Sequence, residues 1–161
     1  MILLKCGVWG YMIRDWSRDD ASSLARYANN RKIWLNLRDA FPHPYTQDDA
    51  ALYIARSLKN VPRTAFAIAT NTEAIGSIGL MPGQEVHRFA AELGYWLGEP
   101  FWGRGIMTEA VKELSEYALE ELGFRRIFAR ALRHKPGFCP GTRKIWIFSG
   151  GDTARKRRKG G

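Results

Sequence analysis

The segment from Leu93 to Ala110 constrains the fold more than any other part of the chain. It begins with an apolar run typical of a strand, passes through a turn that holds Gly103 and Gly105, and ends in a run with helical spacing. The first N–H groups of a helix have no partners within the helix and carry partial positive charge. Glycines before the helix let a phosphate come close to these groups. The segment therefore has the layout of an anion-binding site.

Length and charge bound the rest of the interpretation. The chain has 161 residues, of which 45% are apolar, so we expect one domain with its own core. The net charge of +9 belongs to one end, because residues 133–161 hold nine Lys or Arg against one Asp, whereas residues 1–132 hold 16 basic and 15 acidic residues. A short basic run such as residues 155–159 is more often solvated than a recognition surface. A nucleic-acid partner is therefore not expected.

Compartment and metal content follow from what the sequence lacks. Its longest apolar runs are too short to span a membrane, and its start has neither a basic leader nor a cleavage site. We therefore expect a cytoplasmic protein without a membrane partner. Cys6 and Cys139 have no spacing typical of a disulfide scaffold or of metal ligands, so we expect two free thiols and no metal.

Hydrophobic periodicity and turn residues predict a mixed α+β fold, with a mostly antiparallel sheet flanked by helices. Thr46 with Asp49 indicates a capping box, and Gly123 is placed to end the helix that follows Gly105. The expected strands are residues 11–16, 64–69, 74–81, 89–97 and 124–132, of which the second and third form a hairpin. The expected helices are residues 17–28, 31–37, 46–59 and 106–122.

The segment at residues 93–110 closely resembles the acetyl-CoA-binding motif of the GCN5-related N-acetyltransferases (GNAT), in their RimJ/RimL-like branch. There a Tyr-Trp-Leu strand, matched by residues 95–97, leads into W-G-(R/K/Q)-G-(I/Y)-(M/A)-(T/S)-E-A, matched by residues 102–110. The Gln or Arg that opens the broader GNAT pattern is replaced by Pro100. The resemblance covers roughly residues 12–132. It implies a GNAT-like fold and acetyl transfer from acetyl-CoA, as co-substrate, to a primary amine such as a protein N-terminus or a small amine.

The resemblance also implies a set of site residues. Glu92 matches a position where many GNAT enzymes keep a general base, and the alternative is a surface-facing strand acid. Arg104 can add a cation to the turn, or it is simply solvated. The expected acetyl-CoA contacts are Leu97, Trp102, Gly103, Arg104, Gly105, Ile106 and Met107. The expected substrate contacts are Phe41, His43 and Tyr45, in a Pro-rich loop where the family shapes its acceptor pocket, although such aromatics are more often core residues.

The resemblance stops near residue 132. RimJ/RimL-like proteins continue with an N-x-x-S segment that opens a helix ending in E-K-x-G-F, and then with two strands. Here the positions of the Asn and Ser hold Lys135 and Phe138. We therefore divide the chain into an incomplete GNAT domain at residues 1–132 and an aberrant basic tail at residues 133–161. The last strand, residues 124–132, is then expected to have an uncovered edge.

The genetic code offers an explanation for the change. If each codon's second and third bases are read with the first base of the next codon, residues 134–147 permit the sequence TNPASARVLEKSGF, which is the missing family segment. Trp146 followed by Ile147 must give Gly in that frame, whereas most other positions allow a choice. We infer a single-nucleotide frameshift, real or a sequencing error, between about Phe128 and His134. The alternative is a divergent tail.

Three functions follow from these observations. The first is a GNAT-type N-acetyltransferase acting on an amine. The second is a catalytically impaired or CoA-binding-only remnant of such an enzyme, because both C-terminal site residues are missing. The third is a basic-tailed RNA-associated protein, whose binding would weaken steeply with salt and depend on residues 152–161. The sequence sets neither the acceptor nor the oligomeric state.

Overall fold

The computed structural model describes residues 4–5, 10–129 and 147–149 of the chain, and the side chains of residues 10–129. The strands are β1 (Leu4–Lys5), β2 (Met12–Arg14), β3 (Ala65–Ala69), β4 (Ala74–Pro82), β5 (Ala90–Leu97), β6 (Arg126–Phe128) and β7 (Ile147–Ser149). The α-helices are α1 (Ala21–Ala28), α2 (Arg31–Leu35), α3 (Gln47–Lys59) and α4 (Ile106–Glu120). Short 3-10 turns are η1 (Arg18–Asp20), η2 (Glu85–His87) and η3 (Glu99–Phe101).

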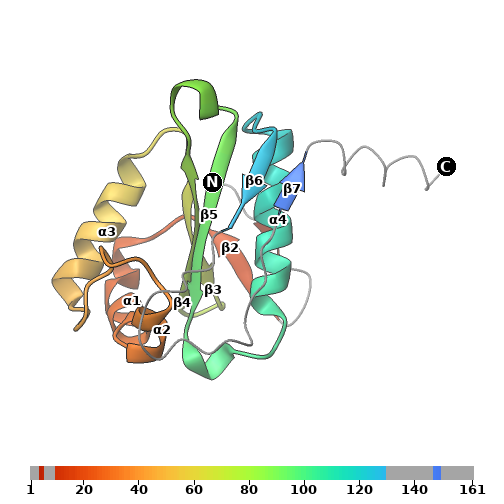
Figure 1. The fold of residues 1–161 in the computed structure, drawn as a ribbon. Coiled ribbons are helices and arrows are strands. Elements are labelled where there is room, and N and C mark those ends of the chain that lie inside the picture. Colours follow the sequence, from red (N-terminus) through yellow and green to blue (C-terminus); the bar gives the residue numbers. More distant parts are fainter. Residues whose placement is uncertain (1–3, 6–9, 130–146, 150–161) are drawn as a thin grey trace.

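The described strands form one sheet in the order β1-β2-β3-β4-β5-β6-β7. Neighbouring strands run antiparallel except β5 and β6, which are parallel and are joined through α4. The helices α1, α2 and α3 lie on one side of the sheet and α4 lies on the other (Figure 1). This is the expected α+β fold with a mixed, mostly antiparallel sheet.

Each face of the sheet has its own core, because successive side chains of a strand point to opposite faces. On β3, Phe66 and Ile68 pack with α4, whereas Ala67 packs with α1 and α3. The α4 side of the core includes Ile106, Ala110, Val111, Leu114 and Ala118. No helix among the described residues is long and apolar enough to cross a bilayer.

Capping residues define two of the helical starts. The Thr46 hydroxyl accepts from the Asp49 N–H at 3.2 Å, and the Asp49 carboxylate accepts from the Thr46 N–H at 2.9 Å. This is the predicted capping box, and α3 ends at the predicted Lys59. Ser17 and Asp20 form a second box, which opens the 3-10 turn before α1. Residues next to each start therefore determine where α3 and η1 begin.

The C-terminal elements differ from the sequence-based expectation. The last predicted strand is represented by β6 alone, and residues 130–132 lie outside the described part of the chain. The expectation of an uncovered edge on this strand is wrong, because β7 pairs antiparallel with β6 and Ile127 lies opposite Phe148. The expected basic run at residues 155–159, together with Lys135 and Phe138, lies outside the described residues.

Candidate functional site

The centre of the sheet opens where β5 and β6 separate. β5 pairs with β4 over almost its whole length, from Ala91 opposite Pro82 to Leu97 opposite Gly76. Its parallel ladder to β6 covers only Ala90 to Glu92. Beyond Glu92, the described residues give β5 a ladder partner on the β4 side alone. A cleft follows this edge of the strand.

The backbone of β5 alternates between its two sides. The N–H of Gly98 donates to the Ile75 carbonyl at 2.8 Å, so even-numbered residues face β4 in this antiparallel pair. The odd-numbered residues Leu93, Tyr95 and Leu97 therefore direct their backbone N–H and C=O groups to the side of the cleft. Such an edge can bind an extended ligand as a further strand would.

The end of β5 is tied to the turn that follows it. The indole N–H of Trp102 donates to the Leu97 carbonyl at 2.7 Å. Trp102 is 43% exposed and lines the cleft, so this bond holds an aromatic surface at the point where β5 leads into the glycine turn.

The glycine turn and the start of α4 form the second wall of the cleft. Gly103 and Gly105 have φ values of +72° and +76°, a region that L-residues rarely adopt. The first hydrogen bond of the helix runs from the Glu109 N–H to the Gly105 carbonyl at 3.2 Å, and no side chain caps this end. The N–H groups of Ile106 to Thr108 therefore have no acceptor within the helix. This is the predicted anion-binding geometry, and it lies beside the open edge of β5.

The backbone of Arg104 lies within the turn, and its side chain extends to Tyr11 and Phe101. Its guanidinium donates to the Tyr11 hydroxyl at 3.3 Å and lies 5.7 Å from the centre of the Phe101 ring. The side chain is exposed, so its charge contributes to the mouth of the cleft rather than to a buried ion pair.

The cleft has a volume of about 630 Å³, within the range of small-molecule sites. The structure brings Glu92 and all seven predicted acetyl-CoA contacts to its lining. Their roles as catalytic and binding residues remain predictions. The lining also includes residues outside the predicted set of contacts: Lys32, Ile33, Asn36, Leu37, Arg38, Met81, Leu93, Gly94, Tyr95, Trp96, Phe101, Thr108 and Ala129.

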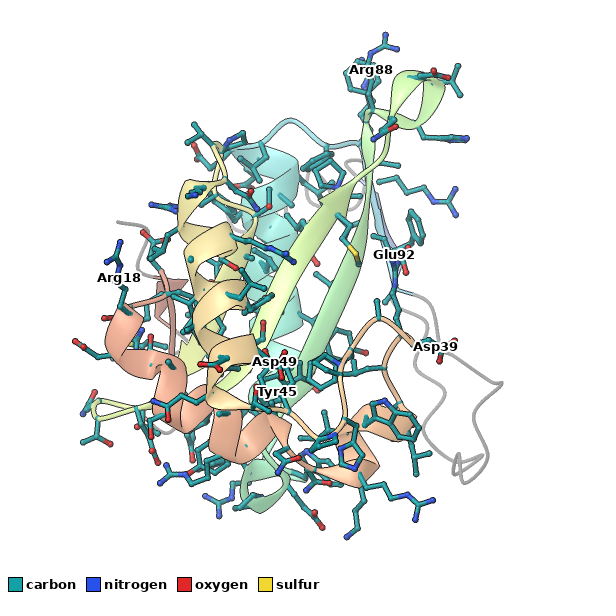
Figure 2. The ribbon with its side chains drawn as sticks, turned by 90° about the vertical axis from the view of Figure 1, so that its left-hand side faces the viewer. Arg18, Asp39, Tyr45, Asp49, Arg88 and Glu92 are labelled. Atoms are coloured by element: carbon teal, nitrogen blue, oxygen red, sulfur yellow. The ribbon has the colours of Figure 1, made fainter. Side chains whose placement is uncertain are left out.

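The three predicted substrate residues do not line this cleft. Tyr45 is buried beside the start of α3, where its N–H donates to the Asn29 side chain at 3.0 Å and its ring stacks on Phe41 at 4.9 Å (Figure 2). Burial raises the pKa of the Tyr45 hydroxyl, so this group is a poor proton donor or acceptor at neutral pH. His43 stacks on Trp34 at 5.4 Å. Phe41 and Tyr45 therefore belong to the core on the α1 and α3 side of the sheet, whereas His43 is exposed.

Two ion pairs link α2 and the loop after it to the cleft. The Arg38 guanidinium lies 2.7 Å from the Glu92 carboxylate, which is only 14% exposed. Lys32 pairs with Glu99, whose carboxylate also accepts from Asn30 at 2.7 Å. The hydrogen bond from Lys32, which is the largest cause, and the one from Asn30 hold the Glu99 pKa below its ordinary value. Sequence spacing gave no signal for either pair.

Known proteins share both the sequence pattern and the fold. The sequence profile of the acetyltransferase (GNAT) domain matches residues 11–137. The uncharacterized N-acetyltransferase p20 of Bacillus licheniformis is 28% identical over 127 residues, which cover 73% of this chain and 67% of that protein.

Two solved structures share the fold at lower identity. The ribosomal-protein acetyltransferase RimL in complex with coenzyme A has a TM-score of 0.65 and 19% identity, over 99% of this chain and 83% of that one. The microcin C7 self-immunity acetyltransferase MccE in complex with acetyl-CoA and AMP has a TM-score of 0.65 and 23% identity, over 81% and 74% of the two chains.

Proposed function

We propose that this chain, which belongs to the GNAT acetyltransferase family, binds acetyl-CoA beside β5 and transfers the acetyl group to a primary amine. One observation carries the proposal: the open edge of β5 and the uncapped start of α4 meet in one cleft. The first suits an extended amide-containing arm, and the second suits phosphates. The solved structures of RimL and MccE, which share this fold, contain coenzyme A and acetyl-CoA respectively.

The residues of the turn fit the pyrophosphate of CoA. A Cβ placed on Gly103 or Gly105 would meet no protein atom within 4 Å, so the space beside both residues is open to a ligand. The N–H groups of Ile106 to Thr108 supply donors, and the start of a 15-residue helix supplies partial positive charge. Arg104 adds a full charge at the mouth. Backbone groups thus provide most of the binding, which agrees with the Pro100 that replaces the family's polar side chain.

The reaction needs a polarised carbonyl and a neutral amine. The amine nitrogen attacks the thioester carbon, a C–N bond forms, and the C–S bond breaks to release CoA. Backbone N–H groups directed from β5 into the cleft, at Leu93 and its odd-numbered neighbours, are suited to stabilise the developing oxyanion. An ammonium is not a nucleophile, so a base must first accept one proton, which passes to solvent. The nitrogen loses a second proton as the amide forms, and that proton finally resides on the CoA thiol.

Glu92 is the acid in the cleft lining that suits the role of base. It stands at the last ladder pair between β5 and β6, opposite Phe128, and its carboxylate is largely buried. This position places it beside the odd-numbered backbone groups of β5. Arg38 holds one carboxylate oxygen and thereby fixes the direction of the side chain.

A thiol-release assay tests the proposal directly. Acetyl-CoA is incubated with the protein and a panel of amines, and free CoA thiol is measured with a chromogenic disulfide. We expect release that requires both substrates, together with CoA binding by calorimetry. Absence of CoA binding by the folded chain would refute the proposed site, and binding without release on any amine would leave only the second candidate below.

The second candidate is a CoA-binding remnant, favoured by Lys135 and Phe138 at the positions of the family's Asn and Ser. A gene corrected by one nucleotide near codon 130 would restore N-x-x-S and the sequence that follows. We expect the corrected protein to release thiol faster than the chain as given. Resequencing distinguishes an error from a true lesion. If the chain as given turns over and the corrected protein is inert, the tail is a genuine part of the enzyme and the frameshift inference is wrong.

A further inference from the structure

The charge of the cleft is divided between two ends. Among the described lining residues the charged side chains are Lys32, Arg38, Arg104 and Glu92. Arg104 belongs to the glycine turn, where phosphates are expected. Lys32 on α2 pairs with Glu99, whose turn η3 directly precedes the glycine turn, whereas Arg38 stands on the loop after α2, beside Glu92. An acceptor that enters along α2 and this loop therefore meets two cations and the carboxylate of Glu92.

The two cations differ in how far they are neutralised. Lys32 is paired with Glu99, which also binds Asn30, so its charge is balanced within the protein. The Nη2 of Arg38 lies 2.7 Å from Oε2 of Glu92, and the Arg38 side chain is 52% exposed. A guanidinium has five N–H donors in a planar fork that fits a carboxylate. Arg38 can therefore hold Glu92 and bind a second carboxylate from the solvent side.

On the basis of the function proposed above, we propose that Arg38 selects the acceptor, and that the acceptor is an amino terminus followed by an acidic residue. The amine would approach Glu92 while the neighbouring carboxylate binds the outer edge of Arg38. Because Arg38 and Glu92 are in direct contact, the two groups of the acceptor must also lie close together, as they do in such a peptide. A polyamine would instead bring its second cation against Arg38, which is unfavourable.

Three peptides of equal length test the selection, with the same first residue and Glu, Gln or Lys in second place. We expect kcat/KM to be about 2- to 5-fold higher for the Glu peptide than for the Gln peptide, the range for an ion pair at an exposed site. The Lys peptide and a small diamine should be poorer still. 7-Aminoheptanoate, whose amine and carboxylate are separated by as many bonds as the N-terminal amine and the Glu carboxylate of the peptide, reports whether a small molecule satisfies the same site.

Variants of Arg38 connect the preference to this residue. Arg38→Lys should keep the order of the peptides, and Arg38→Glu should reverse it in favour of the Lys peptide. The ratio between peptides is the readout, since loss of the contact to Glu92 also changes the absolute rate. Arg18→Glu is the matched control. It makes the same change in net charge on η1, at the opposite side of the molecule from Glu92, and should leave the ratio unchanged (Figure 2).

Calorimetry with the same peptides, on protein with and without saturating CoA, gives a readout that does not need turnover. If no peptide is acetylated but the Glu peptide binds best and Arg38→Glu reverses the order, the selection holds and the proposed reaction fails. A wild-type preference for the Gln or Lys peptide overturns the selection, whether or not thiol is released. An order unchanged by Arg38→Glu also overturns it.

Discussion

Replacement of Gly105 by Ala tests two properties of this residue: its left-handed backbone conformation and the open space beside its Cα atom. Gly105 has a φ of +76°, and a Cβ there meets no atom within 4 Å. An L-residue in this conformation is less stable by about 1–2 kcal/mol. Because no steric clash adds to this term, we expect the free energy of unfolding to fall by about that amount. For a chain of this size, each kcal/mol lowers Tm by about 2–4 °C.

Gly123 provides a matched control at the other end of α4. Its φ is +73°, and its Cβ would also meet no atom within 4 Å. It follows the helix, where the Phe124 N–H donates to the Ala118 carbonyl at 3.1 Å, and it does not line the cleft. Gly123→Ala should therefore lower stability as much as Gly105→Ala does, without a change at the candidate site.

The affinity for CoA should separate the two variants. The methyl group of Gly105→Ala occupies the space from which phosphate oxygens reach the N–H groups of Ile106 to Thr108. Loss of one hydrogen bond to a charged group is about 1.5–3 kcal/mol, so Kd should rise about 10- to 100-fold. Calorimetry with CoA, alongside thermal unfolding of both variants, measures the two effects. Equal Kd values for Gly105→Ala and Gly123→Ala would refute phosphate binding at this turn.

Two further predictions concern carboxylates. Asp20→Asn should lower the free energy of unfolding by about 3 kcal/mol, because Asp20 is buried and accepts two hydrogen bonds of 2.7 Å from Arg14. Burial acts to raise the pKa of Asp20, but the hydrogen bonds from Arg14 and Ser17 hold this pKa below its ordinary value. The stability that Asp20 contributes is therefore present above about pH 4 and is lost as pH falls through the folded-state pKa. In urea unfolding from pH 7 to pH 3, the variant should lose less stability than the wild type, and an equal loss in both would contradict the assignment. Glu92→Gln should lower kcat about 10²- to 10⁴-fold while CoA affinity stays within twofold, and an unaltered kcat would exclude Glu92 as the base.

The parts of the site that depend on neighbours in the sequence could be predicted. Gly103 and Gly105 set the turn through their own conformations, and α4 begins directly after them. The capping box of Thr46 and Asp49 is equally local. In the glycine turn and in the capping box, the residues that form the structure are close neighbours in the sequence, so their order specifies the geometry.

The cations of the cleft could not be predicted in the same way. Arg38 reaches Glu92 only because the loop after α2 lies against β5, and Lys32 reaches Glu99 only because α2 lies beside η3. In sequence both cations look like ordinary surface residues of a short polar helix and its loop. The predicted substrate residues Phe41 and Tyr45 belong to the core on the α1 and α3 side of the sheet. The packing partners that place their rings lie far away in the sequence, so no local pattern could show this.

The position of Glu92 follows from where the central ladder ends. Three register pairs hold β6 to β5, and three more hold β7 to β6, so β6 is bonded along both sides over Arg126–Phe128. This second ladder could not be predicted from the sequence, because strand pairing joins distant segments whose register no local pattern sets. Glu92 occupies the last of the β5 pairs, at the inner corner where the strands separate. A carboxylate at that corner lies next to the backbone donors of β5, and a base for the proposed acetyl transfer must act at that point.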